Sequence, residues 1–84
     1  MKIKRTFTIR HLKTDSQSMW IVDLIMLAGF AESRSEARRV IRQGGVKINE
    51  VIMRNEMMQV DLSSNTTLRV GKRLYADVVK ETEQ

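Results

Sequence analysis

The stretch SRSEARRVIRQGG restricts the fold most, because it carries a helix start signal and a helix stop signal close together. Ser33 and Glu36 match the S-x-x-E capping box, in which the two side chains accept hydrogen bonds from backbone N–H groups of the first turn. Gly44 or Gly45 can take the left-handed conformation that ends a helix. The sequence therefore predicts a short helix from Arg34 to about Gln43.

This predicted helix has an apolar side and a basic side. At about 100° per residue, Ala37, Val40 and Ile41 fall on one arc, which we expect to be buried. The other side carries four arginines with no acid to pair them inside the helix, since the capping box already uses the glutamate. Like charges four residues apart repel by a few tenths of a kcal/mol, so a polyanionic partner would relieve the repulsion; the alternative is an ordinary solvated face. The arginines are Arg34, Arg38, Arg39 and Arg42.

The positive charge of the chain gathers in its first half. The formal net charge is +5, and residues 1–45 hold nine lysines and arginines against four acids, whereas residues 46–84 hold six of each. Such an imbalance suggests a polyanionic partner, most often nucleic acid, although composition alone leaves a merely soluble basic surface equally open. Lys47 extends the basic patch just after the double glycine, where a sugar–phosphate backbone can approach a main chain that lacks Cβ atoms.

The segment MWIVDLIMLAGF predicts a preceding helix that ends at Gly29. Ser16 or Ser18, in the polar run before it, is expected to be its N-cap. Asp23 is its only charged residue, so most of the helix must be buried. Its expected core stripe consists of Trp20, Leu24, Leu27 and Ala28.

The remaining segments predict strands joined by polar turns. The run VKIN alternates with Val46 and Ile48 inward. A tight hairpin turn at Gly71 and Lys72 joins the last two strands. The opening of the chain alternates loosely and is either a strand or an ordered arm. The expected strands cover residues 2–12, 46–49, 57–60, 67–70 and 73–79, and a polar tail follows.

The sequence offers groups for binding rather than a catalytic site. It has no cysteine, which excludes disulfides and thiolate metal sites, and it contains none of the common phosphate-loop or nucleophile motifs. His11, the single histidine, is expected at the surface. Trp20 and Tyr75 can stack on bases, but a tryptophan on an apolar stripe is more often core. No apolar run approaches the roughly 20 residues of a membrane span, and no signal peptide opens the chain, so we expect a cytoplasmic protein that binds no metal and no membrane.

The run GFAESRSEARRVIRQGGVKIN resembles the core motif of the S4 (S-four) RNA-binding domain, in which two helices and a following strand present a basic face to RNA. With LRVGKRLYADV it is most similar to the C-terminal domain of bacterial-type tyrosyl-tRNA synthetases, and the match covers roughly residues 20–79. The resemblance implies an α+β, S4-like (alpha-L motif) fold, with two short packed helices followed by a small, mostly antiparallel sheet of about four strands. It also implies RNA contacts at Arg34, Arg38, Arg39, Arg42, Gln43, Lys47, Asn49, Lys72 and Arg73.

The same resemblance implies a domain that docks and orients tRNA-Tyr, near its variable arm and anticodon stem, for a catalytic body outside this chain. ATP and tyrosine would bind only in that body, and neither a cofactor nor a catalytic residue is expected here. The isolated domain is expected to be a monomer, and the full synthetase a homodimer through its catalytic domain. The expected layout is an N-terminal arm or linker over residues 1–17, the RNA-binding domain over 18–79, and the tail over 80–84.

Other interpretations stay open. The chain is alternatively a freestanding S4-like protein associated with the ribosome, or the RNA-binding domain of a pseudouridine synthase. A module for proteins or membrane surfaces is a further alternative, although few large apolar residues share the basic helix. The synthetase domains usually have a glycine after KIN, where this chain has Glu50, so the turn at that point departs from the family pattern.

Overall fold

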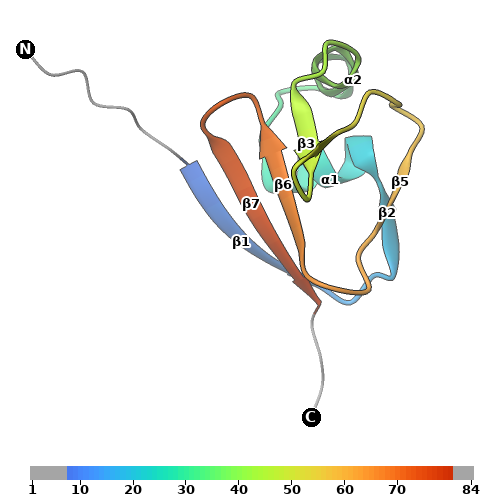
Figure 1. Cartoon of the computed structure of the whole chain (residues 1–84), viewed down its shortest axis with the longest axis vertical. Coiled ribbons are helices and arrows are strands. Elements are labelled where there is room, and N and C mark those ends of the chain that lie inside the picture. Colours follow the sequence, from blue (N-terminus) through green and yellow to red (C-terminus); the bar gives the residue numbers. More distant parts are fainter. Residues whose placement is uncertain (1–7, 81–84) are drawn as a thin grey trace, which may run out of the picture.

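The computed structural model describes residues 8–80, which form two neighbouring helices and two sheets (Figure 1). Two strands precede the helices and the others follow them. The elements are β1 (Thr8–Thr14), β2 (Ser18–Trp20), α1 (Ile21–Ala28), α2 (Arg34–Arg42), β3 (Val46–Ile48), β4 (Val51–Ile52), β5 (Gln59–Asp61), β6 (Thr66–Val70) and β7 (Leu74–Lys80).

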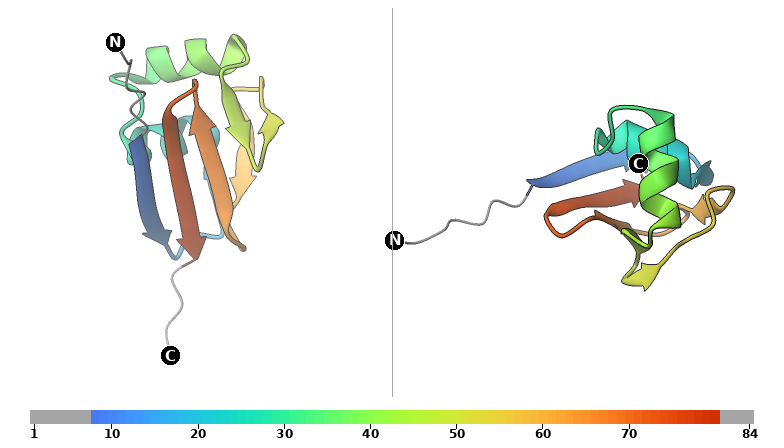
Figure 2. Two further views of the ribbon diagram at one scale, coloured as in Figure 1. Left: turned by 60° about the vertical axis from the view of Figure 1, so that its left-hand side comes forward. Right: turned by 90° about the horizontal axis from the view of Figure 1, so that it is seen from above.

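The main sheet has five strands in the order β1, β7, β6, β3, β4, and β2 pairs with β5 in a separate two-stranded sheet. β1 runs parallel to β7, with Thr8 opposite Leu74, whereas every other pair of strands is antiparallel. Figure 2 shows α2 lying across one end of the main sheet and α1 behind it. The predicted α+β fold with a mostly antiparallel sheet is confirmed. The main sheet has five strands where about four were expected, and the second sheet of β2 and β5 was not predicted.

The core lies between α1, α2 and one face of the main sheet, because alternate strand residues point toward the helices. Val46 and Ile48 of β3 are buried opposite Val70 and Leu68 of β6, which confirms the inward orientation predicted for the first two. The helices contribute almost completely buried side chains from Ile21, Leu24, Ile25, Ala28, Ala37 and Ile41.

Helix α1 ends at Gly29 as predicted, with φ at 76°, but its start and its buried face differ from the prediction. Neither Ser16 nor Ser18 is the N-cap, because residues 18–20 pair with β5 and the helix begins only after Trp20. This pairing leaves the Trp20 side chain 45% exposed, and Leu27 is 52% exposed, so neither belongs to the core stripe that we expected. The apolar arc instead consists of Ile21, Val22, Leu24, Ile25 and Ala28.

Both ends of α2 follow their sequence signals, although the Glu36 carboxylate contacts the residue before Ser33 instead of the Ser33 backbone. The Glu36 N–H donates to Ser33 Oγ at 3.1 Å, while the Glu36 carboxylate accepts from the Glu32 N–H at 2.7 Å. Gln43 is the C-cap, and Gly44 has a φ of 79°. The left-handed glycine predicted at the helix end is therefore confirmed as Gly44.

The connection from β3 to β4 explains how the chain accommodates Glu50. Asn49 and Glu50 have φ values of 51° and 70° and form a two-residue turn, after which Val51 lies opposite Ile48. Two left-handed residues in succession are typical of the tight turns that match strand twist. The Asn49 side chain supports the turn, because its Oδ1 accepts from the Thr67 N–H at 2.9 Å. Strand β4 was not predicted from the sequence.

The other strand boundaries shift by a few residues. The turn between β6 and β7 spans residues 71–73 rather than Gly71 and Lys72 alone, and the strand expected at 57–60 begins at Gln59. Within the segment expected as an arm or linker, residues 1–17, Thr8–Thr14 form a strand of the main sheet. The remainder of the predicted opening strand, residues 2–7, and the tail from residue 81 lie outside the described residues.

Candidate nucleic-acid interface

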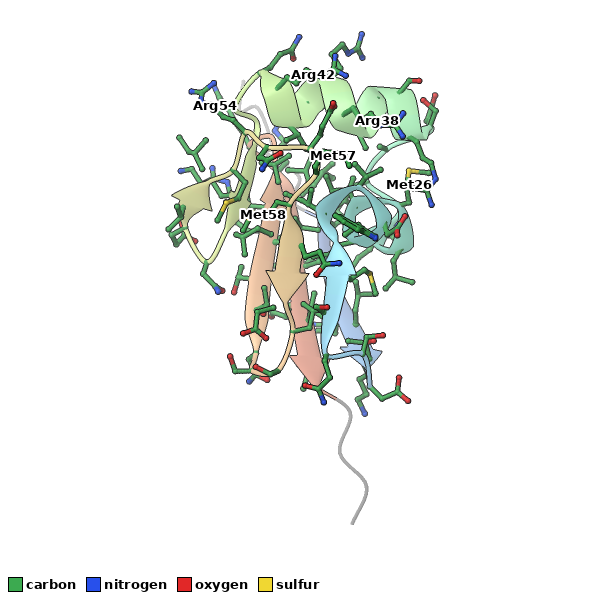
Figure 3. The ribbon with its side chains drawn as sticks, turned by 90° about the vertical axis from the view of Figure 1, so that its right-hand side faces the viewer. Met26, Arg38, Arg42, Arg54, Met57 and Met58 are labelled. Carbon is green, nitrogen blue, oxygen red and sulfur yellow. The ribbon has the colours of Figure 1, made fainter. Side chains whose placement is uncertain are left out.

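Helix α2 turns its four arginines away from the core. Ala37 and Ile41 are completely buried on its inner side, whereas Arg34, Arg39 and Arg42 are exposed. Because the helix crosses one end of the sheet, its basic side forms one end of the molecule, and Figure 3 shows Arg42 there. We call this surface the arginine face; it consists of Arg34, Arg38, Arg39 and Arg42.

Acids from other elements hold two of these arginines. Arg34 Nη2 lies 2.6 Å from Asp23 Oδ1 of α1. Arg42 donates to Glu56, in the loop before β5, from Nε at 3.0 Å and from Nη2 at 3.3 Å. The sequence analysis expected no acid inside the helix to pair with these arginines, and both of these acids lie outside α2. They are distant in sequence, so only the tertiary fold brings them to the helix.

Acidic side chains contact Arg38 and Arg39 less closely than they contact Arg34 and Arg42. Arg39 Nη2 is 4.0 Å from Glu36 Oε2, the limit for an ion pair. Arg38 is half-buried and has no acidic partner within residues 8–80. An arginine without a carboxylate keeps its N–H groups available for a phosphate.

Arg54 covers the C-terminal end of α2, where Figure 3 shows it. Its guanidinium lies so close to Gly44 that a Cβ on this glycine would be 2.7 Å from Arg54 Nη1. A cation at this end of a helix interacts favourably with the last carbonyl groups. Gly44 thus provides both the left-handed turn and the space for Arg54, a residue that sequence reasoning did not select.

A basic hollow of about 360 Å³ begins at the double glycine that follows α2 and extends onto the main sheet. Lys47 and Lys72, both predicted from the sequence, line it together. Three glycines, Gly44, Gly45 and Gly71, form much of the remaining wall. The Gly71 N–H donates to the Gly45 carbonyl at 2.8 Å, so the turn after α2 and the turn after β6 are joined. The lining residues are Gly44, Gly45, Lys47, Arg69, Gly71 and Lys72.

Arg69 is a lining residue that the sequence analysis missed. It lies opposite Lys47 on one side and Tyr75 on the other, so all three share the outer face of the sheet. Its guanidinium lies 5.2 Å from the centre of the Tyr75 ring, which favours a cation–π contact. Its buried Nε has no hydrogen-bond partner within the described chain. The alternation of apolar and polar residues in TLRV indicates that Arg69 points outward from the sheet. Only the register of β3 with β6, however, shows that Lys47 lies beside it.

Three predicted contact residues belong neither to this hollow nor to the arginine face. Gln43 is exposed at the C-cap of α2, close to the arginine face. Arg73 is exposed in the turn before β7, and its carbonyl accepts from the Thr8 N–H at 2.8 Å. Asn49 lies at the far end of β3, where its side chain already stabilises the turn. The structure therefore brings Lys47 and Lys72 together in one hollow next to the double glycine that follows α2, and places Asn49 at the other end of β3.

The described part of the chain, residues 8–80, contains neither a cluster of metal ligands nor a helix that could span a membrane. No group of three or more histidine, cysteine, aspartate and glutamate side chains in this range could hold a metal ion. Neither α1 nor α2 is long and apolar enough to cross a membrane.

Comparison with known proteins gives one family and a consistent set of relatives. Residues 19–64 match the S4 domain. The chain is 36% identical over 66 residues to a tyrosine–tRNA ligase of Helicobacter hepaticus and 41% identical over 66 residues to that of Moorella thermoacetica, and each alignment covers 79% of this chain and 16% of the relative. A tyrosine–tRNA ligase of Thermotoga maritima is 42% identical over 60 residues. The chain thus spans about a sixth of the length of these relatives.

Proposed function

Because the chain belongs to the S4 domain family of RNA-binding domains, we propose that it docks and orients tRNA for a tyrosine–tRNA ligase. The proposed ligand is tRNA-Tyr, held near its variable arm and anticodon stem. Aminoacylation, with its ATP and tyrosine, would take place in a catalytic body outside this chain. In this proposal the isolated domain is a monomer, the full synthetase is a homodimer through that body, and both work in the cytoplasm.

The observation that carries the proposal is that the helix with the arginine face leads directly into the double glycine, and that both glycines line the basic hollow. Arg38 supplies a cation without an acidic partner, and Lys47 and Lys72 add two more where the double glycine opens the backbone. A row of cations along a surface without Cβ atoms suits a sugar–phosphate backbone. The proposed contacts are those of Arg34, Arg38, Arg39, Arg42, Gln43, Lys47, Lys72 and Arg73, with Arg69 as an addition.

Recognition of this kind depends on shape and backbone charge more than on sequence. Phosphate contacts fix the position of a structured RNA, and the tRNA identity then follows from where the helical arms lie. The ion pairs of Arg34 and Arg42 lower the affinity for RNA, because phosphate oxygens must replace Asp23 and Glu56 as acceptors. Each neutralised phosphate releases counterions, so the affinity falls steeply with salt.

Filter binding of the domain to tRNA-Tyr across a salt series tests the proposal. We expect Arg38→Ala to weaken binding and to reduce the slope of log K against log salt by about 1. Lys13→Ala is the matched control, because Lys13 is an exposed cation of β1 opposite Val79, toward the end of the sheet away from α2 (Figure 2). The proposed interface would be refuted if the affinity did not depend on the salt concentration. It would also be refuted if Arg38→Ala and Lys13→Ala weakened binding equally.

A transfer RNA with a short variable arm tests the choice of ligand. If the domain contacts the variable arm, tRNA-Tyr binds more tightly than a tRNA that lacks the long arm, measured at the same salt concentration. If the domain bound both tRNAs with equal affinity, it would be a general RNA-binding domain, and the proposal that its ligand is tRNA-Tyr would be wrong.

A further inference from the structure

A second hollow, of about 150 Å³, includes Arg34 and Arg38 of the arginine face and differs from the basic hollow because large apolar side chains line it. Trp20 and Met57 line it with 45% and 67% of their surface exposed, and Val22 is buried beneath. Arg38 lies at its edge, and Figure 3 shows Arg38 and Met57 on the same side of the molecule. The lining residues are Trp20, Val22, Asp23, Arg34, Arg38, Glu56 and Met57.

The backbone holds Trp20 firmly while its side chain stays accessible. Trp20 is paired with Gln59 of β5, and the next residue, Ile21, donates its N–H to the Met58 carbonyl at 2.9 Å. The backbone at Trp20 therefore need not be ordered when a ligand covers the indole. Its large apolar surface therefore favours a flat partner that can lie against the indole.

The charges around this hollow indicate what kind of flat partner fits. Asp23 and Glu56 are already engaged by arginines, whereas Arg38 has no acidic partner within residues 8–80. An aromatic surface next to an available guanidinium suits a nucleotide, because the base can stack while its phosphate meets the cation. The hollow also shares Arg34 and Arg38 with the arginine face, so one RNA can reach both.

We propose that this hollow binds one unpaired nucleotide, whose base stacks on Trp20 next to Met57 and whose phosphate contacts Arg38. The inference rests on the proposed RNA-binding function and adds a contact to it that a regular duplex cannot make. Bases inside an A-form helix are stacked on each other, whereas loops, bulges and ends can present a base to an aromatic side chain. The hollow thereby distinguishes RNA with an unpaired nucleotide from fully paired RNA.

Trp20 is the only tryptophan of the chain, so its fluorescence reports directly on the hollow. The experiment titrates the domain with a tRNA hairpin arm that carries an unpaired loop, and separately with a blunt duplex of the same stem. We expect the loop-containing RNA to quench Trp20 and the duplex to bind without quenching. Duplex binding with equal quenching, or loop binding without any change in fluorescence, would overturn the proposal.

Substitution at Trp20 measures the contribution of stacking. We expect Trp20→Ala to weaken binding of the loop-containing RNA about tenfold, the scale of one base–aromatic stack, and to leave duplex binding unchanged. Trp20→Phe should keep most of the affinity. Leu27→Ala is the matched control, because Leu27 is also exposed but does not line the hollow.

Salt dependence separates failure of this inference from failure of the proposed function. Stacking neutralises no phosphate, so Trp20→Ala should leave the salt slope at the wild-type value, whereas Arg38→Ala reduces it. If the wild-type domain binds both RNAs in a salt-dependent way while Trp20 is unquenched and its replacement has no effect, only the stacking proposal fails. If the wild-type domain binds neither RNA, the proposed function itself fails.

Discussion

Glu56 forms a bidentate ion pair with the guanidinium of Arg42, in which Nε donates to Oε1 at 3.0 Å and Nη2 donates to Oε2 at 3.3 Å. The same pair of N–H groups is the one that a phosphate would use. Glu56 therefore orients Arg42 and also competes with RNA for it. In the proposed complex, one anion replaces another at this position.

Removal of the competing charge should strengthen RNA binding. We expect Glu56→Gln to tighten the complex with tRNA by about two- to fivefold, the range of a partly exposed ion pair, and to steepen the salt slope. Filter binding across a salt series measures both quantities. Glu50→Gln removes the same charge from the distant β3–β4 turn and should have little effect. Weaker binding of Glu56→Gln would mean that orientation of Arg42 matters more than competition.

Gly44 is expected to be intolerant of a side chain for two separable reasons. Gly44→Ala should destabilise the domain by about 1–2 kcal/mol from its φ of 79° alone, and should cost more because Arg54 must leave the end of α2. Gly71→Ala isolates the first effect, since Gly71 also has a positive φ, of 66°, with no atom within 4 Å of an added Cβ. Urea denaturation of both variants measures the difference between their free energies of unfolding. Equal losses would show that Arg54 adds nothing to stability.

The turn at Glu50 is an opportunity to stabilise the domain. Because Glu50 has a φ of 70°, Glu50→Gly should raise the free energy of unfolding by about 1 kcal/mol. Asn49→Gly relaxes the neighbouring residue in the same way but removes the 2.9 Å hydrogen bond from the Thr67 N–H, so we expect no gain from it. Thermal denaturation should rank Glu50→Gly above the wild type and Asn49→Gly at or below it. The opposite order would contradict this account of the turn.

The N-terminal cap of α2 should contribute measurably to stability. Ser33→Ala removes the acceptor for the Glu36 N–H and is expected to cost about 1 kcal/mol. Ser35→Ala is a matched control inside the helix, where alanine has the higher helix propensity, so this variant should be neutral or slightly stabilising. Chemical denaturation of the two variants tests the assignment. Equal stabilities of both variants would show that the cap is energetically unimportant.

Local signals in the sequence were sufficient for α2 and for the end of α1. A capping serine, a left-handed glycine and an apolar arc act within a few residues of each other, so they predict a helix without knowledge of the fold. Trp20 shows where such reasoning fails. Its place in the apolar run suggested core, but pairing with Gln59 of β5 draws its backbone into a strand and leaves its side chain outside.

The candidate site was predictable in its residue types and less so in its electrostatics. The spacing of the α2 arginines and the position of Lys47 indicated a basic face, and Lys72 does join Lys47 in one hollow. The partners Asp23 and Glu56 could not be predicted, because the sequence does not show which distant acids reach α2. Arg69 was hidden for the same reason, since its proximity to Lys47 depends on strand register.

The parallel pairing of β1 with β7 has a consequence for synthesis on the ribosome. The first described strand completes its hydrogen bonds only with the last one, so the main sheet cannot close until β7 has left the exit tunnel. Contacts between such distant segments slow folding, because a long loop must close before the contacts form. The two helices can form earlier from local signals. The RNA-binding surface is therefore expected to become complete late, when β6 and β7 bring Arg69 and Lys72 against the end of α2.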